Sequence, residues 1–224
     1  MQWIDLGNPH PLPSPSAYAP IEWPASDVVP LAPAVDVSAR AFRDVANARR
    51  TRRSFAALDL DALGVLLNLT CRVQQLGGVE LGFPLTRRPS PSAGAIHPIH
   101  LIVLAPDQVG WHRYDPFRHA LIKVPTTVDA HLVRREMEEL VAAPAATLLL
   151  FAAEPGMTAA KYGNPWSLVW RDAGALQGGL SLAAEALDLS FCPLGVTGEP
   201  WISRLLDQPG LAGVGAAFVG ATPR

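Results

Sequence analysis

The segment Leu168 to Leu187 most constrains how this chain can fold. Its apolar and small residues recur on almost every side at helical spacing, so the sequence predicts a long helix that is apolar nearly all round. Such a helix has to be buried. With 49% apolar residues in 224, the chain can form one full domain, and this helix is too apolar for the surface of a domain of that size. We therefore expect a homodimer.

Shorter elements are expected around this helix. Helices are predicted at 38–49 with Ser38 as N-cap, from Asp59 or Asp61 to before Gly77, at 128–142 and at 201–206. Strands at 99–105, 110–114 and 120–124 are predicted to form an antiparallel meander, with further strands at 147–153, 191–194 and 214–219, and a loop at 77–92. This order lacks the regular strand and helix alternation of a dinucleotide-binding sheet, so the predicted fold class is α+β.

Residues 1–36 are predicted to form an extended N-terminal arm, ahead of a domain that spans 37–224. Eight of the 22 prolines lie between Pro9 and Pro33, and proline at this density forbids a helix. The arm also carries aromatic residues, among them Trp3, Tyr18 and Trp23, whereas disordered tails are poor in aromatics. We expect the arm to be ordered and to pack on the domain or on a partner subunit.

Charge and hydropathy exclude several classes of function. Eighteen Lys and Arg against 20 Asp and Glu give a net charge of -2, which lacks the positive field of a nucleic-acid-binding protein. The longest apolar runs are shorter than the roughly 20 residues that span a bilayer, so no membrane segment is expected. The first residues have neither a basic nor an apolar region of a secretion signal, which predicts a cytoplasmic protein.

A metal site is not expected. Cys71 and Cys192 have no nearby partner in the sequence and are interpreted as small core residues. Four histidines have weakly metal-like spacing, but no cysteine or carboxylate cluster accompanies them: His97, His100, His112 and His119.

Three short segments have compositions that suit chemistry. The first segment, residues 49–54, has four arginines in five positions, followed by Ser54. Guanidinium and hydroxyl groups bind phosphate, so the segment is a candidate phosphate site. The alternative is a basic helix end that faces solvent. Pro91 to Pro98 is a rigid loop of small residues that a flat ligand can approach closely, or an ordinary loop. Lys161-Tyr162 offers an acid and base pair, or a surface turn.

Together, these segments resemble the SagB-type dehydrogenase branch of the FMN-dependent nitroreductase superfamily. Arg49 to Phe55 is similar to its Arg-Arg-Ser-x-Arg-x-Phe entry, and Pro91-Ser-Ala-Gly-Ala-Ile-His-Pro98 to its Pro-Ser-Ala-Gly-Ala-Leu-Tyr-Pro loop. Trp111 to Pro116 resembles its Tyr-x-Tyr-Asp-Pro hairpin, Lys161-Tyr162-Gly163 its Lys-Tyr-Gly, and Asp172-Ala-Gly174 its long helix. The resemblance covers about residues 38 to 220 and implies a mostly antiparallel sheet flanked by helices, in a homodimer.

The resemblance also implies roles for single residues. Around the FMN phosphate, ribityl chain and pyrimidine edge it places Arg49, Arg50, Thr51 and Arg53. Separately from the resemblance, Arg224 at the end of the given sequence is a further candidate phosphate ligand. Along the flavin, across the dimer interface, the resemblance places Pro91, Ser92, Ala93 and Gly94, and at N5 and O4 the backbone amides near Leu194 and Gly195. The catalytic pair is Lys161 and Tyr162, which in this branch assists proton removal while hydride passes to N5, converting a peptide azoline into an azole.

Three functional hypotheses follow. The first is azoline oxidation in a peptide natural-product pathway, with a peptide or small-molecule substrate and possible help from a partner biosynthetic enzyme. The second is an NAD(P)H-dependent nitro or quinone reductase on the same fold, which needs no catalytic lysine. The third is a non-catalytic flavin-fold protein that binds a peptide or an enzyme. Three departures from the family pattern leave the fold intact but bear on the substrate and on the third hypothesis: His97, Pro165 and Ala175.

Overall fold

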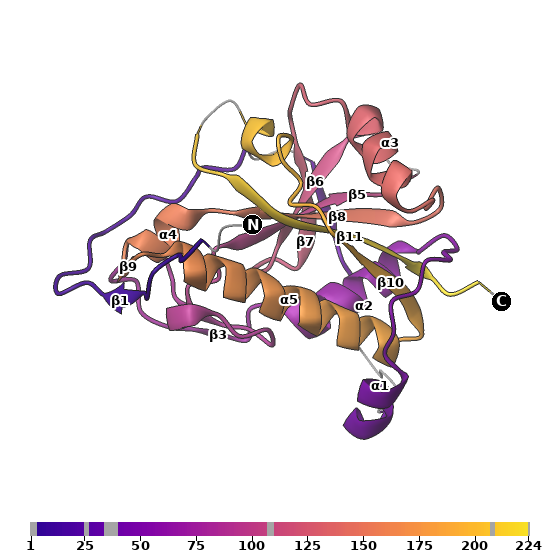
Figure 1. The fold of residues 1–224 in the computed structure, drawn as a ribbon, viewed down its shortest axis with the longest axis horizontal. Helices are drawn as coiled ribbons and strands as arrows, with labels where there is room; N and C mark the ends of the chain where they lie inside the picture. Colours follow the sequence, from indigo (N-terminus) through magenta and orange to yellow (C-terminus); the bar gives the residue numbers. More distant parts are fainter. Residues whose placement is uncertain (1–3, 25–26, 34–39, 107–109, 207–208, 224) are drawn as a thin grey trace.

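A seven-stranded antiparallel sheet forms the centre of the molecule in the computed structural model, which describes residues 4–24, 27–33, 40–106, 110–206 and 209–223 (Figure 1). Along the sheet the order is β10 (Leu189–Leu194), β11 (Ala212–Ala221), β8 (Thr147–Ala153), β5 (Ile99–Leu104), β6 (Trp111–Asp115), β7 (Ala120–Val124) and β2 (Val28–Pro30). The predicted meander is confirmed, since β5, β6 and β7 pair consecutively and antiparallel.

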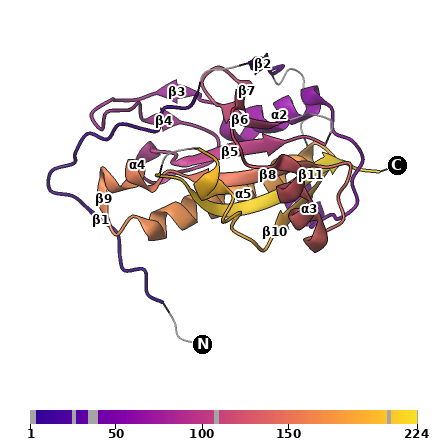
Figure 2. The same ribbon diagram turned by 90° about the horizontal axis from the view of Figure 1, so that it is seen from above.

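Helices cover both faces of this sheet. They are α1 (Phe42–Ala48), α2 (Leu60–Cys71), α3 (Ala130–Leu140), α4 (Pro155–Ala159) and α5 (Trp166–Ala186), with two short 3₁₀ turns, η1 (Ala93–Ala95) and η2 (Ile202–Arg204). Helices α2 and α5 pack on one face and α3 and η2 on the other (Figures 1 and 2). This is the α+β class that the sequence predicts.

Strand β8 shows how the core divides between the two faces. Every residue of the strand is buried, and successive side chains point to opposite faces. Leu149, Phe151 and Ala153 pack toward α2 and α5, whereas Leu148, Leu150 and Ala152 pack toward α3. A strand buried on both sides reads as a continuous apolar run, which is why the sequence predicted it with its observed bounds.

Two helix predictions require correction. The first helix begins at Phe42, with Ala41 as N-cap and no side-chain cap hydrogen bond, whereas the predicted cap Ser38 lies outside the described residues. The segment 201–206 contains only a 3₁₀ turn at Ile202–Arg204, because one turn does not provide the successive hydrogen bonds of an α-helix. The helix behind Asp59 is confirmed, and the Asp59 side chain accepts a hydrogen bond from the Ala62 N–H.

Small strands appear where the sequence suggested arm or loop. Strand β1 (His10–Pro11) pairs with β9 (Tyr162–Gly163). Strand β3 (Gln75–Leu76) lies where the second predicted helix was expected to continue, because that helix ends at Cys71, and β3 pairs with β4 (Thr86–Arg87) inside the region expected to be loop. Within the arm, β2 adds to the edge of the main sheet, where proline is tolerated. The described part of the arm is therefore ordered and lies on the domain, while Trp3 and the boundary at residues 36 and 37 fall outside the described ranges.

Candidate functional site

The arginine-rich segment runs from the end of α1 along the edge of the main sheet. The Arg52 N–H donates to the Phe191 carbonyl of β10 at 3.1 Å, and Ala56 forms a bridge with Ala221 of β11. The Arg52 side chain donates to both carboxylate oxygens of Glu185 in α5, at 2.9 and 2.7 Å. Arg52 is thus a structural anchor that fixes the segment between β10 and α5.

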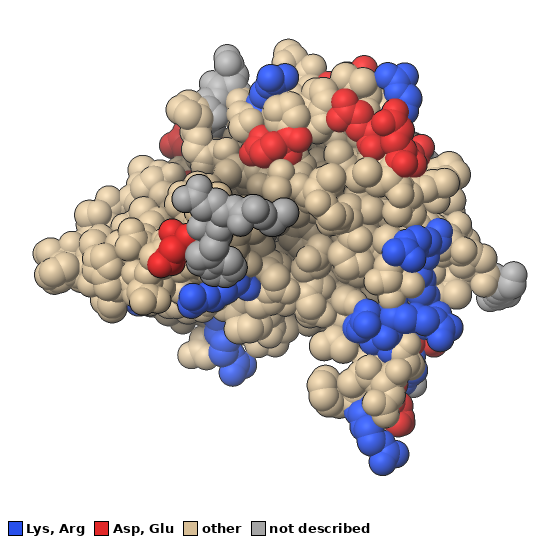
Figure 3. Space-filling view, in the orientation of Figure 1, with Lys and Arg blue, Asp and Glu red and all other residues tan. Residues whose placement is uncertain are grey.

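The four residues of this segment that were predicted to hold FMN are exposed: Arg49, Arg50, Thr51 and Arg53. Since the side chain between Thr51 and Arg53 is tied to the domain, its neighbours are held at the surface. Figure 3 shows Lys and Arg side chains gathered over α1 and the adjoining end of β10. Guanidinium groups that face solvent in such a cluster can bind the oxygens of a phosphate.

Two neighbouring hollows adjoin these arginines. One, of about 480 Å³, is lined by Arg49, Pro193 and the Gly174 to Leu182 part of α5. The other, of about 280 Å³, is lined by Arg53, Pro193, Leu194 and Gly195. Because both include Pro193, they form one continuous surface from α5 across the end of β10.

Glycines keep this surface open. A Cβ atom added at Gly174, Gly178 or Gly195 would meet no atom within 4 Å. The absence of side chains at these positions leaves room for a flat group to lie against the backbone. Leu194 itself is buried, and it supplies backbone to the rim of the hollow. Arg224 lies outside the described residues.

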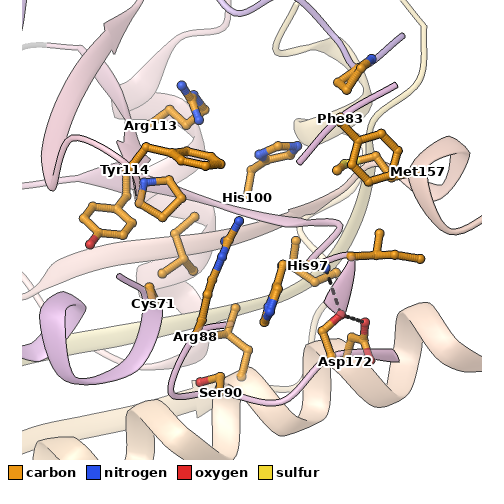
Figure 4. Close-up of a pocket in the computed structure, with 18 of the residues that line it drawn as sticks. Cys71, Phe83, Arg88, Ser90, His97, His100, Arg113, Tyr114, Met157 and Asp172 are labelled. Atoms are coloured by element: carbon orange, nitrogen blue, oxygen red, sulfur yellow. Dashed lines mark hydrogen bonds between the residues drawn. The ribbon is translucent and has the colours of Figure 1, made fainter. Parts of the chain in front are cut away.

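The small-residue loop 91–98 is held by one carboxylate of α5. Asp172 accepts hydrogen bonds from the Ser92 hydroxyl at 2.5 Å and from the Ala93 N–H at 3.0 Å. The Ser92 hydroxyl oxygen in turn accepts the His97 N–H at 2.9 Å, as Figure 4 shows beside Asp172. Burial raises the pKa of Asp172, and the hydrogen bonds from Ser92 and Ala93 oppose that rise. The loop is therefore a fixed structure whose shape depends on a residue 80 positions away.

Lys161 and Tyr162 meet the same loop. A Cβ on Gly94 would lie 3.0 Å from the Tyr162 hydroxyl and 3.2 Å from the Lys161 Nζ, so both polar ends converge on this glycine. The Lys161 Nζ also lies 5.7 Å from the centre of the Tyr162 ring. Gly94 has a φ of 63°, in the left-handed region that favours glycine. Two segments that the sequence singled out separately thus form one cluster.

The N-terminal arm crosses this cluster. Besides the β1–β9 pairing, the Leu12 N–H donates to the Lys161 carbonyl at 2.9 Å and the Ser16 N–H to the Ala160 carbonyl at 3.0 Å. A Cβ on Gly163 would lie 2.5 Å from the His10 ring, which shows how closely the arm lies over β9. The backbone that carries Lys161 and Tyr162 is therefore held on one side by residues 10–16.

Helix α5 separates the two groups of predicted site residues. At 3.6 residues per turn, Gly174 lies about 200° around the helix from Asp172. The Asp172 side holds the loop with Ser92 and Ala93, and the Gly174 side lines the hollow with Arg49. Within one chain, the arginine surface and the Gly94, Lys161 and Tyr162 cluster therefore lie on different sides of the same helix.

The sequence did not identify two carboxylates that organise this region, Asp172 and Glu154. Glu154 is fully buried and accepts the Ile21 N–H at 2.7 Å and a His100 Nε2 hydrogen bond at 2.9 Å. Burial opposes its ionisation, but these bonds, with one from Tyr18, lower the pKa of Glu154. The available signal was an acidic residue within or beside a buried apolar element, because such a group needs donors.

The described part of the chain has neither a cluster of metal ligands nor a helix that could span a membrane. There, no three His, Cys, Asp or Glu side chains gather in a way that could hold a metal ion. Among the same residues, no helix has the length and apolar character needed to cross a bilayer.

Comparison with known proteins places the fold. Over residues 46–220 the chain matches the model of the family described as "Nitroreductase family". A comparison with curated proteins gave no match.

Solved structures of similar fold include a protein assigned as a nitroreductase from Ralstonia eutropha JMP134, with a TM-score of 0.65 and 18% identity over 95% of this chain and 100% of that one. The E. coli microcin synthetase McbBCD complex with truncated pro-MccB17 bound has a TM-score of 0.60 and 18% identity, over 86% of this chain and 76% of that one. A protein from Desulfovibrio desulfuricans assigned as a nitroreductase, in complex with FMN, has a TM-score of 0.50 and 16% identity, over 84% of this chain and 92% of that one. At these identities the likeness shows the fold.

The family match covers most of the chain, and the antiparallel sheet with flanking helices agrees with it. The chain belongs to the nitroreductase family and has its flavin oxidoreductase fold.

Proposed function

We propose that this protein is an FMN-dependent dehydrogenase that oxidises azoline rings in peptides to azoles. The cofactor fits the open surface beside α1, where exposed arginines adjoin a backbone without side chains at Gly174, Gly178 and Gly195. Arg49, Arg50, Thr51 and Arg53 would hold the phosphate and ribityl chain, and the backbone near Leu194 and Gly195 would face the ring. One of the solved structures of similar fold is in complex with FMN.

A homodimer completes this site. Because the arginine surface and the loop 91–94 lie on different sides of α5, the loop that covers one cofactor has to come from a second copy. The exposed side of α5 suits such an interface, since Trp166 and Trp170 remain 41% and 40% exposed in a helix that is otherwise strongly apolar. Pro91, Ser92, Ala93 and Gly94 of one copy would then line the flavin held by the other.

The reaction removes one hydride and one proton from the azoline ring. Bound FMN supplies the two-electron acceptor for the hydride, and dioxygen or another acceptor later takes the electrons. The proton leaves a ring carbon and has to reach a base in the pocket. Lys161 Nζ and Tyr162 OH, which converge on the loop that would cover the flavin, are placed to hold and move that proton.

The convergence of Lys161 and Tyr162 on Gly94 is the observation that carries this proposal. A reductase that accepts hydride from NAD(P)H and passes it to a nitro or quinone group has no need of a lysine and phenol pair at this position. The structural likeness to a microcin synthetase complex with a bound peptide precursor supports a peptide substrate. An enzyme that forms the azoline would then act immediately before this one.

Cofactor binding is tested first, by the visible absorption spectrum of the purified protein after addition and removal of excess FMN. We expect retained FMN. A protein that retains none would favour the alternative of a non-catalytic binding protein and would remove both enzyme hypotheses.

The catalytic pair is tested with Lys161→Ala and a synthetic peptide that contains one thiazoline. Since the amine that assists proton removal is gone, we expect oxidation, detected as the loss of two hydrogen atoms in mass, to fall by 10²-fold or more, on the order of a general base contribution. FMN binding and reduction of a nitroarene with NADH should persist. The chain has one other lysine, and Lys123→Ala is the matched control. Unchanged thiazoline oxidation in Lys161→Ala would remove the catalytic role of Lys161. An unaltered protein that reduces nitroarenes but does not oxidise thiazoline would favour the nitro and quinone reductase alternative.

A further inference from the structure

A partly open pocket of about 190 Å³ lies apart from the arginine surface, on the other side of α5. It is enclosed by the arm at Trp23, by β5 and β6, by the end of α2 at Cys71 and by the α5 side chains Asp172 and Leu176. Figure 4 shows its polar side chains, with Arg88 extending from the bottom of the view into the space between Tyr114 and His100. The pocket shares Pro91 and Ser92 with the loop that the proposed function places along the flavin, and its other lining residues have no role in the proposed oxidation.

Arg88 enters the cavity with an uncompensated charge. Its Nε donates to the Thr86 hydroxyl at 3.0 Å, but among the described residues its two terminal nitrogens donate to no protein acceptor and no carboxylate lies within 4 Å. Burial lowers the pKa of Arg88 to about 10, so the guanidinium stays charged at neutral pH. A half-buried cation without an ion-pair partner carries a desolvation cost, and an anion beside it would offset that cost.

Other donors around the cavity are also unpaired. Within the described residues, Arg113 Nε, Trp23 Nε1 and Ser90 Oγ are buried without a hydrogen-bond partner. Arg113 has one carboxylate near it, Asp115, at a distance of 3.9 Å that is too long for a hydrogen bond. The side chains of Arg113, Trp23 and Ser90 line the same pocket as Arg88, with the Ser90 hydroxyl lying toward Gly179 of α5.

The charge of Asp115 acts on Arg88 but forms no ion pair with it, and the guanidinium carbon of Arg88 lies 6.0 Å from the centre of the Phe117 ring. The two other carboxylates near the pocket are engaged elsewhere. Asp172 accepts from Ser92 and Ala93, and Glu154 accepts from Ile21 and His100. The local electrostatics thus leave a positive group facing an open volume.

The remaining walls of the pocket are apolar. The volume of the pocket limits the size of the ligand that it can hold. The apolar lining residues include Phe83, Ile96, Ile99, Leu101, Phe117 and Met157. An apolar cavity of about 150 Å³ holds a benzene molecule. A cavity slightly larger than that, with a guanidinium on one wall, matches a six-membered ring that carries one carboxylate.

We propose that this cavity is a binding site for a small hydrophobic carboxylate of about the size of benzoate, with Arg88 as the carboxylate ligand. Arg113 and Trp23 supply the further donors that give an anion its specificity, and the apolar walls receive the ring. The site is separate from the arginine surface, but its wall includes Pro91 and Ser92, which the proposed function places along the flavin, and His97 of the same loop.

The test is a calorimetric titration of the full chain, saturated with FMN if FMN binds, with sodium benzoate and separately with benzamide. We expect saturable benzoate binding and at least tenfold weaker binding of benzamide, because the neutral amide does not compensate the guanidinium. Equal affinity for the two compounds, or no benzoate binding up to about 10 mM, would overturn the proposal. Binding of inorganic phosphate without binding of benzoate would overturn the proposal that the ligand carries an apolar ring.

The location of the benzoate site is tested by comparing benzoate binding in Arg88→Gln with binding in the control variant Arg87→Gln. Arg87 is the preceding residue and is exposed. Arg88→Gln is expected to weaken benzoate binding tenfold or more, and Arg87→Gln to leave it unchanged. Equal effects would place the ligand elsewhere. If Arg88→Gln does not fold, the comparison of benzoate with benzamide on the unaltered protein still decides the question.

Discussion

Gly94 shows how much of this site depends on a single backbone position. Its φ of 63° and the two polar side chains within about 3 Å of its missing Cβ each exclude a larger residue. Ala95 and His97, with φ of 59° and 53°, continue the left-handed backbone without being glycine. Such conformations persist only where surrounding bonds enforce them, and here Asp172 and Ser92 do so.

A methyl group at this position should disturb the catalytic pair. Gly94→Ala is expected to reduce thiazoline oxidation by tenfold or more, because the new Cβ would displace Lys161 Nζ and Tyr162 OH. Gly110→Ala is the control, since Gly110 also has a positive φ, of 106°, but its added Cβ would have its nearest neighbour at 3.8 Å. Urea unfolding of both variants measures the cost of backbone strain at a positive φ. Steady-state oxidation rates of both variants measure the effect of the new contact with Lys161 and Tyr162. Equal losses of activity would contradict the role of the contact.

His97 makes stability depend on pH. Burial, with Arg88 nearby, lowers the pKa of His97 to about 4, while its Nε2 bonds the Thr86 carbonyl at 2.9 Å. The unfolded chain binds a proton near pH 6.5 and the folded chain does not, so stability falls as pH decreases from 6.5 toward 4. At about 1.4 kcal/mol per pKa unit this corresponds to about 3 kcal/mol at most.

The measurement is the urea unfolding free energy at several pH values between 4 and 7. His97→Asn, chosen because Asn tolerates the left-handed backbone, is expected to lose part of the slope with pH. His131→Asn, at an exposed position of α3, should retain it. A slope identical in all three proteins would show that His97 titrates in the folded state as it does in the unfolded state.

At the scale of elements, the arm is held to the sheet by one buried carboxylate. Glu154 contacts Tyr18, Ile21 and His100, and it immediately precedes α4. Glu154→Gln replaces one acceptor oxygen by a donor, so at least one of these bonds is lost in a buried site. We expect a loss of about 1–3 kcal/mol in unfolding free energy.

The local effect of Glu154→Gln should appear as proteolysis within residues 9–23, detected by mass spectrometry, before the domain is cleaved. Glu139→Gln, at an exposed position of α3, is the control. Cleavage at the same rate in both variants would mean that the arm is held by its backbone bonds alone.

The elements that the sequence predicted well are those determined locally. Helix α2 has Asp59 as its cap, and β5, β7 and β8 are mostly apolar runs bounded by turn residues. Strands β1, β2 and β9 were not predicted, because segments of two or three residues become strands only where another segment offers an edge, and β1 and β2 also contain proline. The same holds for the site: the residue types of Arg49 to Arg53 and Lys161 indicated chemistry, but their placement around α5 depends on tertiary packing.

At the scale of the whole molecule, α5 is buried along one side in a single copy. Val169, Leu180 and Ala184 are fully buried, whereas Trp166 and Trp170 are not. The sequence predicted a helix that must be buried nearly all round, and the proposed homodimer would provide the missing cover.

Trp170→Glu places a charge on the exposed side of α5 and is expected to convert a dimer to a monomer, measured by light scattering. FMN affinity should fall with it, because half of each site is lost. Phe117→Glu, which changes an exposed aromatic residue in the turn between β6 and β7, is the control for solubility. A dimer that persists in Trp170→Glu, or a monomeric unaltered protein, would remove the shared site.

The arm also has a consequence for the order of synthesis. Its anchoring partners, Glu154 and the backbone at residues 160–163, are about 140 positions later in the sequence. Contacts of such long separation form only after a costly loop closure. On the ribosome, residues 10–21 would emerge well before these partners and would wait for them before docking. This segment therefore reaches its native position long after it is made, and it closes over Lys161 and Tyr162 when it does.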